Sequence, residues 1–358
     1  MSFSQIIISW YHKNKRDLPW RRTRDAYHIW VSEIILQQTR VQQGLNYYYD
    51  FIRNYPTIEH LANAPLQNVL KVWQGLGYYS RARHMHETAE IIMDKYDGRF
   101  PDEYSAIKSL KGVGEYTAAA IASIAFKKAY PVIDGNVYRV LSRYYAIDVS
   151  INSSQGKKHF RKTAESLMDK NNPGDFNQAM MELGATVCQT SHPKCPECPL
   201  SKECQAFQKK QVSLFPIRNK KKLQKKRHFN YVIILSNNYL CIQKREGSDI
   251  WNSLYEFPMI ESSQLLDEKQ LLADNKWDNG IIEKENTNIF YESKTYRHML
   301  THRIIYAKFF IIKVEHDKML HFIQQQPRVF KIHVSELKHY PIPKLIENFL
   351  NETSVIKH

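Results

Sequence analysis

The chain has 358 residues, more than a single hydrophobic core usually supports, so we expect two domains. Against 36 aspartates and glutamates stand 51 lysines and arginines, and the formal net charge of +15 favours a nucleic-acid partner over a merely basic surface. No stretch approaches the roughly 20 apolar residues of a membrane span. A secretory signal is also lacking, so we expect a soluble, cytoplasmic protein with no membrane partner.

The first part of the chain has helical periodicity. Segments such as Ala26–Val41 and Thr117–Phe126 carry apolar residues three and four positions apart between Gly and Pro breaks. We therefore expect an all-α domain over residues 1–210. It is followed by a linker at 211–228, which includes the run RNKKKLQKKR with seven basic and no acidic residues. This linker either is a solvated connector or also follows a phosphate backbone.

The rest of the chain, residues 229–358, mixes strand and helix patterns. The segment FNYVIILSNNYLCIQKR predicts two strands around an Asn-Asn turn, and HRIIYAKFFIIKV is rich in β-formers. The segments EHDKMLHFIQQQ and IPKLIENFL look helical. We expect an α+β domain, in which Cys241 is a buried strand residue.

Four cysteines crowd into a short loop at residues 188–204. Cys188, Cys195, Cys198 and Cys204 follow the spacing Cys-x6-Cys-x2-Cys-x5-Cys, with Pro196 and Pro199 between them. Four thiolates at this density suit a [4Fe–4S] cluster or a tetrahedral zinc ion, and an intracellular metal site is more consistent with this crowding than disulfides are. Spacing chemistry alone leaves iron and zinc open.

Two acids stand in unusual positions. Glu33 lies within WVSEIILQQT, a mostly apolar helix, where burial would raise the pKa of its carboxyl and let it donate a proton. Asp134, in VIDGNV, precedes a helix and reads equally as an N-cap and as a functional carboxylate, and the two readings are compatible. Two acids in such different settings can divide the roles of proton donor and charge-stabilising carboxylate.

A third motif, LKGVGEYT at residues 110–117, fits a turn between two helices. Its glycines allow close approach of the backbone, and the amides that follow can hold a phosphate. Together with the cysteine loop, the SEIILQQT segment and the DGNV segment, it resembles the MutY family of the helix-hairpin-helix superfamily that includes endonuclease III. Lys111 stands where relatives usually have proline.

The resemblance implies a nucleoid-associated monomer with a [4Fe–4S] cluster on the four cysteines. Its expected substrate is duplex DNA with adenine opposite 8-oxoguanine or guanine. Glu33 would protonate the adenine ring and help activate water, and Asp134 would stabilise the sugar cation near the Tyr116 hydroxyl. Lyase-competent relatives have a lysine in place of Tyr116, so we expect base removal without strand cleavage.

The resemblance also implies DNA contacts. Gln38 and Tyr78 match intercalating positions, although each alone is more typical of an ordinary surface or core residue. Further expected contacts to phosphates or the opposite strand are Arg16, Arg21 and Arg81, with Gly112 and Gly114 in the hairpin.

The second domain resembles the Nudix-like domain with which MutY proteins recognise 8-oxoguanine, notably in WNSLYEFP at residues 251–258. It lacks the Arg-Glu-x-x-Glu-Glu core of the Nudix box, so we do not expect phosphohydrolysis. The family's Phe-Ser-His turn corresponds to Leu300-Thr301-His302, in which Leu replaces Phe. A plain strand end is the alternative reading of these residues.

Two other functions fit parts of the pattern. A thymine–guanine mismatch glycosylase shares the helical domain and the tyrosine hairpin but usually lacks the second domain. A non-catalytic iron–sulfur DNA-binding protein would not need both carboxylates.

Overall fold

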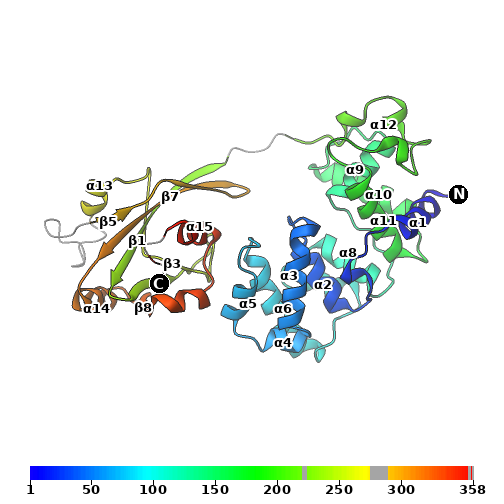
Figure 1. Ribbon diagram of the computed structural model, residues 1–358. Coiled ribbons are helices and arrows are strands. Elements are labelled where there is room, and N and C mark those ends of the chain that lie inside the picture. The colour runs from blue at the N-terminus through cyan, green and yellow to red at the C-terminus, as the bar shows by residue number, and fades with distance from the viewer. Residues whose placement is uncertain (220–223, 275–288, 354–355, 357–358) are drawn as a thin grey trace. The chain divides into compact units, whose positions relative to one another are not determined.

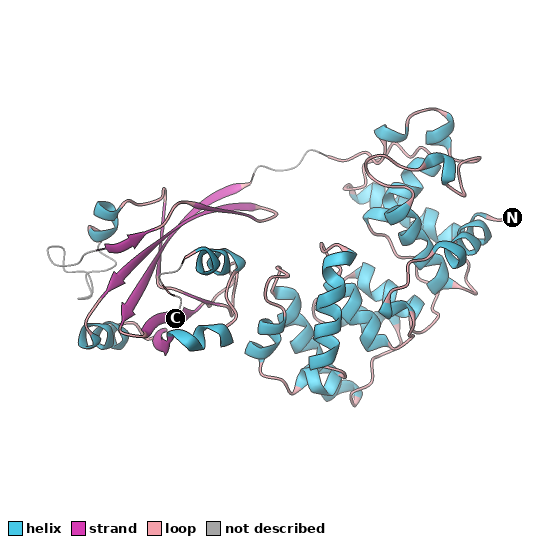
Figure 2. Ribbon diagram, in the orientation of Figure 1, coloured by secondary structure: helices cyan, strands magenta, loops and turns pink. Residues whose placement is uncertain are grey.

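The computed structural model describes residues 1–219, 224–274, 289–353 and 356. It divides into two compact units, one formed by Met1–Asn63 and His84–Lys220 and the other by Ala64–Arg83 and Lys221–His358. Helices make up the first unit, whereas the strands all belong to the second (Figures 1 and 2). Within the described residues, no helix combines the length and apolarity needed to cross a bilayer.

The first unit is an assembly of mostly short helices whose buried faces follow the predicted periodicity. They are α1 (Phe3–Asn14), α2 (Ala26–Ile35), α3 (Val41–Asn54), α4 (Ile58–Ala62), most of α6 (Ser80–Tyr96), α7 (Tyr104–Ser109), α8 (Glu115–Ile124), α9 (Gly135–Tyr144), α10 (Ser154–Leu167), α11 (Pro173–Thr186) and α12 (Gln205–Gln208). Short 3-10 turns lie at Pro19–Arg21, Cys195–Glu197 and Val212–Leu214.

The helix predicted over Ala26–Val41 is interrupted. Helix α2 ends at Ile35, and α3 begins at Val41 after a turn that contains Gln38. Gln38 has a φ of +57°, which a continuous right-handed helix does not allow. The apolar pattern therefore located both helices but not the turn that separates them.

The second unit contains a mixed sheet. Its strands are β1 (Lys225–Ser236), β2 (Tyr239–Lys244), β3 (Tyr255–Glu256), β4 (Met259–Ser262), β5 (Ile289–Glu292), β6 (Tyr296–Met299), β7 (Arg303–Lys313) and β8 (Val329–His333). The same unit contains helices α5 (Leu66–Val72), α13 (Glu268–Leu272), α14 (His316–Gln325) and α15 (Lys344–Glu352), and a 3-10 helix at Val334–His339. The main path of the sheet is β3-β2-β1-β7-β5, and β1 and β7 run parallel at its centre. This confirms the predicted α+β class and the hairpin at Asn237-Asn238.

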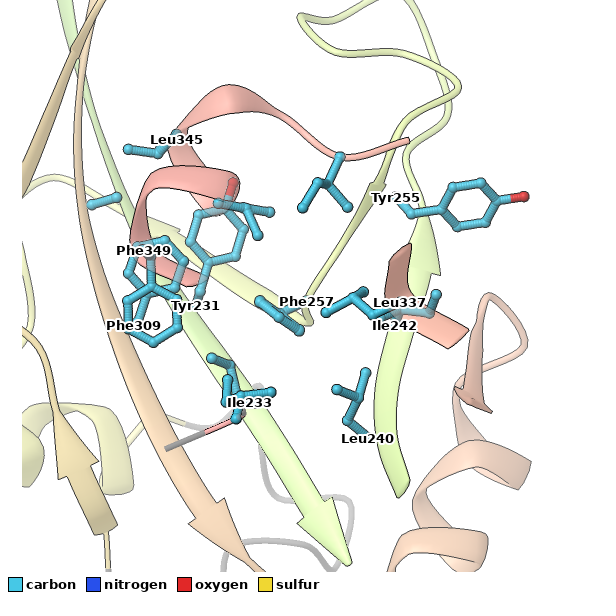
Figure 3. Close-up of a cluster of buried hydrophobic side chains, with 14 of the residues drawn as sticks. Tyr231, Ile233, Leu240, Ile242, Tyr255, Phe257, Phe309, Leu337, Leu345 and Phe349 are labelled. Carbon is cyan, nitrogen blue, oxygen red and sulfur yellow. The ribbon is translucent and has the colours of Figure 1, made fainter. Parts of the chain in front are cut away.

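Both faces of the central strand β1 are buried. Phe229, Tyr231 and Ile233 join one apolar cluster, while Val232 and Ile234 join another. Figure 3 shows the first cluster, where the Phe349 ring of α15 stacks on Phe309 of β7 with centroids 4.0 Å apart. Burial on both faces explains why β1 reads as a continuous apolar run rather than an alternating one. Cys241 is fully buried in the second cluster, as predicted.

The predicted linker at 211–228 is partly structured at its carboxyl end, where Lys225–Arg227 already belong to β1. The basic composition of the run predicted a linker there, but Arg227 is neutralised by ion pairs to Asp249 at 2.8 Å and Glu261 at 2.6 Å. Residues 220–223 of the run lie outside the described residues.

The structure also groups residues 64–83 with the second unit rather than with the predicted helical domain. Gln67, Lys71 and Tyr79 each hydrogen-bond to a backbone carbonyl within the segment 339–342.

Candidate active site

Glu33 is held on a helix that is buried almost along its whole length. Asp25 caps the start of α2 by accepting a hydrogen bond from the backbone N–H of His28 at 3.0 Å. Nine of the ten residues of α2 are buried, and Glu33 itself is 7% exposed. Burial is the main reason that the pKa of Glu33 is raised to about 7. The carboxylate of Asp134 raises this pKa further, whereas the hydrogen bond from Tyr116 and the charge of Arg21 lower it. The carboxyl can therefore hold a proton near neutral pH, as predicted from the sequence.

Tyr116 reaches Glu33 from the predicted hairpin. It is the second residue of α8, and its hydroxyl donates a hydrogen bond to Oε2 of Glu33 at 2.5 Å. The turn before α8 needs glycine at position 112, because φ is +73° and a Cβ would lie 2.7 Å from Cβ of His84. Gly114 caps α8, and a Cβ there would meet nothing within 4 Å. The open space leaves this backbone accessible to a partner.

Lys111, the lysine nearest to Tyr116 in the sequence, belongs to the other side of the turn. Its Nζ lies 3.6 Å from Oε1 of Glu87, and its carbonyl accepts a hydrogen bond from Thr88 at 2.9 Å. Both contacts tie Lys111 to α6, and the residues that line the cavity containing Glu33 do not include it. The geometry thus offers no amine from this lysine to the Glu33 site.

Asp134 is the N-cap of α9, as one of its two sequence readings predicted, and its role as a functional carboxylate stays a prediction. Its Oδ1 accepts from the backbone N–H groups of Asn136 at 2.9 Å and Val137 at 2.7 Å, and its Oδ2 accepts from the Asn136 amide at 2.7 Å. Burial raises the pKa of Asp134, and these three bonds oppose the rise. The cap therefore fixes the carboxylate in one orientation.

The three predicted catalytic side chains meet in one cavity of about 180 Å³. The cavity is lined by Glu33, Tyr116 and Asp134, and also by polar residues that the sequence analysis did not single out: Asn136, Gln178 and Glu182. Glu182 could have been found, because it is an acid within the apolar stretch AMMELGA of α11, the same signal that identified Glu33. Tyr11 donates a hydrogen bond to Oε1 of Gln178 at 2.8 Å and so fixes that amide at the cavity wall.

Arg16 and Arg21, which we expected to contact DNA, bind Glu182 at this cavity. Arg16 donates from Nε to Oε1 at 2.8 Å and from Nη2 to Oε2 at 2.7 Å, and Arg21 donates to Oε2 at 2.7 Å. The Glu182 side chain is fully buried. Burial alone would raise its pKa, but the hydrogen bonds from the two arginines outweigh it and lower the pKa to about 2. These arginines build the pocket wall, and a DNA contact by either stays a prediction.

Replacing Glu182 with glutamine should destabilise the protein by about 3 kcal/mol, because two guanidinium groups would lose their buried counter-charge. The wild-type ion pair should contribute its full stability above the ordinary carboxyl pKa and lose it as the pH falls toward 2. Urea denaturation at several pH values measures both effects. Glu115→Gln is the matched control, since Glu115 pairs with Lys108 and Arg161 at the surface, where such pairs contribute about 1 kcal/mol or less. Equal losses in the two variants would contradict the prediction.

The two predicted intercalating residues share a backbone conformation. Gln38 and Tyr78 are both exposed, and their φ angles are +57° and +50°. Non-glycine residues rarely adopt this left-handed conformation, and it concentrates at functional positions. Each side chain is thus presented on a constrained turn, as an inserted wedge would require.

Arg81, another expected DNA contact, is 8% exposed and supports the Tyr78 turn. Its Nη2 donates to the carbonyl of Gly77 at 3.0 Å, and its guanidinium lies 5.1 Å from the Trp73 ring centroid. The structure therefore gives Arg81 a role in holding the turn, and its contact with DNA stays a prediction.

In the second unit, Thr301 and His302 occupy the turn between β6 and β7, where both are exposed. The Thr301 hydroxyl is hydrogen-bonded to the hydroxyl of Tyr78. Both residues line a cavity of about 590 Å³ together with Tyr78, Trp251 and Leu300. The predicted recognition turn and one predicted intercalating residue thus meet within this unit.

The four cysteines line a separate cavity of about 30 Å³. Among the described residues, no group of three or more His, Cys, Asp or Glu side chains is placed to hold a metal ion. Arg139 of α9 connects this loop to the acid site: its Nε donates to the carbonyl of Cys188 at 2.6 Å, and its Nη2 donates to Oδ1 of Asn136 at 2.8 Å. Asn136 in turn hydrogen-bonds to Asp134. No pattern in the sequence singles out Arg139, because its partners are backbone carbonyls and a neighbour on its own helix.

Comparisons with known proteins agree with this geometry. Residues 31–169 match the family described as "HhH-GPD superfamily base excision DNA repair protein", and residues 230–352 match the NUDIX domain. The chain is 35% identical to the adenine DNA glycosylase of Buchnera aphidicola subsp. Acyrthosiphon pisum, with 97% of each chain covered. It is 46% identical to the human adenine DNA glycosylase over 58% of this chain and 40% of the human one.

Two solved structures resemble the helical part. A thermostable thymine-DNA glycosylase superposes with a TM-score of 0.54 and 33% identity, covering 58% of this chain and 95% of its own. An endonuclease III–DNA complex, at 22% identity and a TM-score of 0.50, shares the fold, again with 58% of this chain and 94% of the other. Since the match to the Buchnera protein extends over both domains, the chain belongs to the adenine DNA glycosylase (MutY) family of hydrolases that act on N-glycosyl bonds in duplex DNA.

Proposed function

We propose that the protein removes adenine paired with 8-oxoguanine or guanine from duplex DNA, without cutting the strand. The observation that carries the proposal is the meeting of Glu33, Tyr116 and Asp134 in one cavity. One carboxyl there holds a proton near neutral pH, while the other is fixed by three hydrogen bonds. Acid catalysis of glycosidic cleavage needs a pair of this kind.

The adenine must leave the base stack to reach this cavity, because its glycosidic bond is inaccessible within the duplex. The exposed side chains of Gln38 and Tyr78 are suited to fill the gap that the flipped base leaves behind. Gln178, whose Oε1 accepts from Tyr11, lines the cavity and can offer its amide N–H groups to the edge of the base.

Glu33 donates its proton to a ring nitrogen of adenine as the bond between C1′ and N9 breaks, and the bonding electron pair passes into the base. The sugar then carries positive charge, which the carboxylate of Asp134 stabilises. Water adds to C1′, and its surplus proton returns to the carboxylate of Glu33. The products are free adenine and an abasic site.

Strand cleavage by a Schiff-base route would need an amine beside C1′. Tyr116 occupies the position next to Glu33, and its phenol stays neutral because burial and the two carboxylates raise its pKa well above the ordinary value. Lys111 is tied to α6. These contacts support a monofunctional enzyme.

We further propose that the second unit reads the base opposite the adenine. The cavity lined by Tyr78, Trp251, Thr301 and His302 combines aromatic surface with hydroxyl and imidazole groups, which suits an oxidised purine. Leu300 at the edge of this turn supplies apolar surface but no ring, which distinguishes this chain from the Phe-Ser-His pattern.

Cys188, Cys195, Cys198 and Cys204 would hold a [4Fe–4S] cluster. They line one cavity, and four cysteine thiolates are the donor set that such a cluster takes. When bound, the cluster would cross-link the four cysteines of the loop, which α9 contacts through Arg139 and Arg143. No step of base removal passes through it.

The decisive test uses the purified protein with duplexes that carry adenine opposite 8-oxoguanine, adenine opposite guanine, thymine opposite guanine, or thymine glycol. We expect abasic sites only in the two adenine duplexes, with strand breaks that appear only after alkali. Release of thymine would favour the mismatch glycosylase suggested by the 33% identical thymine-DNA glycosylase. Strand breaks without alkali would contradict the proposed role of Tyr116.

A further inference from the structure

Arg143, near the carboxyl end of α9, has contacts that the proposed excision mechanism does not explain. The residue is 3% exposed, so its guanidinium is a buried positive charge. Burying such a charge is costly unless it is paired or fully hydrogen-bonded. Its partners therefore indicate what the charge is for.

The guanidinium of Arg143 is surrounded by acceptors from the cysteine loop and from the segment that follows it. Nη1 donates to the carbonyl of Gln189 at 2.7 Å, and Nη2 donates to that of Thr190 at 3.3 Å. Nε donates to the carbonyls of Val212 at 3.1 Å and Phe215 at 3.2 Å. These acceptors are all neutral, and none supplies the counter-charge that a buried cation needs.

The remaining contacts of Arg143 are with sulfur. Nη1 lies 3.4 Å from Sγ of Cys188, a normal distance for an N–H···S hydrogen bond, and the Arg143 carbonyl lies 3.4 Å from Sγ of Cys204. Arg143 also lines the cysteine cavity itself. One residue thus touches two of the four sulfurs, one through its side chain and one through its backbone.

Four thiolates around a [4Fe–4S] core would carry a net negative charge, which would supply the counter-charge for the guanidinium. Reduction of such a cluster adds one electron and makes the group more negative. A buried cation and an N–H donor to a ligand sulfur stabilise the reduced form more than the oxidised form. Both therefore raise the reduction potential.

We infer that Arg143 is a positioning residue for the cofactor, which sets the reduction potential of the cluster and protects it from loss. The inference rests on the proposed [4Fe–4S] cofactor and goes beyond it, because it assigns the effect to one side chain and one sulfur. Arg139 differs in its role, since it contacts the carbonyl of Cys188 rather than the sulfur and continues toward Asn136.

The test compares the full-length wild-type protein, purified without oxygen, with Arg143→Gln and Arg143→Lys. Iron and zinc contents are measured first, then the midpoint potential of the cluster by voltammetry, then the rate of iron loss in air. Arg161→Gln is the matched control: it also removes one positive charge from the helical unit, but Arg161 pairs with Glu115 and does not line the cysteine cavity.

We expect Arg143→Gln to shift the potential to more negative values and to lose iron about 10-fold faster than wild type. Arg143→Lys keeps the charge but not the planar fork, so it should show a smaller shift in the same direction. Arg161→Gln should match wild type in both measurements.

An unchanged potential and an unchanged rate of iron loss in iron-loaded Arg143→Gln would overturn the inference while leaving the proposed function intact. If that variant does not fold, Arg143→Lys decides by the same two measurements, and wild-type values in it overturn the inference. Zinc without iron in the wild-type protein would instead overturn the proposed cofactor, and the inference with it.

Discussion

Replacement of Glu33 with glutamine is expected to slow adenine release by about 10²–10⁴-fold, the usual contribution of a general acid. Glutamine has nearly the same shape and still accepts the hydrogen bond from Tyr116, but it has no proton to give. Single-turnover kinetics on a duplex with adenine opposite 8-oxoguanine measures the effect. Binding of the same duplex should change little, because Glu33 lies in the cavity and is 7% exposed.

The dependence of the rate of adenine release on pH tests the role of Glu33 independently. Since burial raises the pKa of Glu33 to about 7, the wild-type rate should be highest below that value and should fall as the pH rises through it. Glu33→Gln should lack this fall. A wild-type rate that is constant between pH 6 and pH 9, roughly one to two units on either side of the transition, would show that Glu33 is not the proton donor.

Replacement of Asp134 with asparagine separates its two roles. Asparagine is as good an N-cap as aspartate, so the free energy of unfolding should change by about 1 kcal/mol or less. The negative charge beside the developing sugar cation is lost, however, and the rate of adenine release should fall by about 10²–10³-fold. Chemical denaturation and single-turnover kinetics measure the two effects on one preparation.

Asp134→Ala provides the comparison, because it removes the cap as well as the charge. It should match Asp134→Asn in the lost rate and should cost about 1 kcal/mol more in stability. If Asp134→Asn retained the wild-type rate, the carboxylate would be only a helix cap.

The sequence was most informative where a residue contradicted its surroundings. The apolar surroundings of Glu33 predicted that it is buried, and the place of Asp134 before a helix predicted that it is an N-cap. Both predictions are correct, because burial of a charge and capping of a helix are local effects. Glu182 carried the same signal and was overlooked.

The partners of the arginines could not be predicted in the same way. Arg16 and Arg21 read as surface cations, yet both bind a carboxylate that lies more than 160 residues away in the sequence. Arg139 and Arg143 bind mainly backbone carbonyls, which every residue has and no sequence pattern marks. Long-range partners of this kind appear only when the chain is folded.

The interruption between α2 and α3 was missed for a related reason. The apolar spacing over Ala26–Val41 suits one helix, and the positive φ of Gln38 breaks it within a stretch that contains neither glycine nor proline. Conformational strain of this kind is held by the surrounding packing rather than by the residue itself. The start of β1 was likewise missed, because Lys225–Arg227 pair with Arg303–Ile305 of β7, a long-range contact that the charge of the run does not indicate.

Helix α9 has a wider consequence for the cell. Its start anchors the carboxylate of Asp134, which is proposed to be catalytic, and further along it carries both arginines that bind the cysteine loop. If the loop holds the proposed cluster, a chain made during iron starvation would lack that cluster. The loop that α9 contacts would then lose its cross-link, although no proposed chemical step consumes iron.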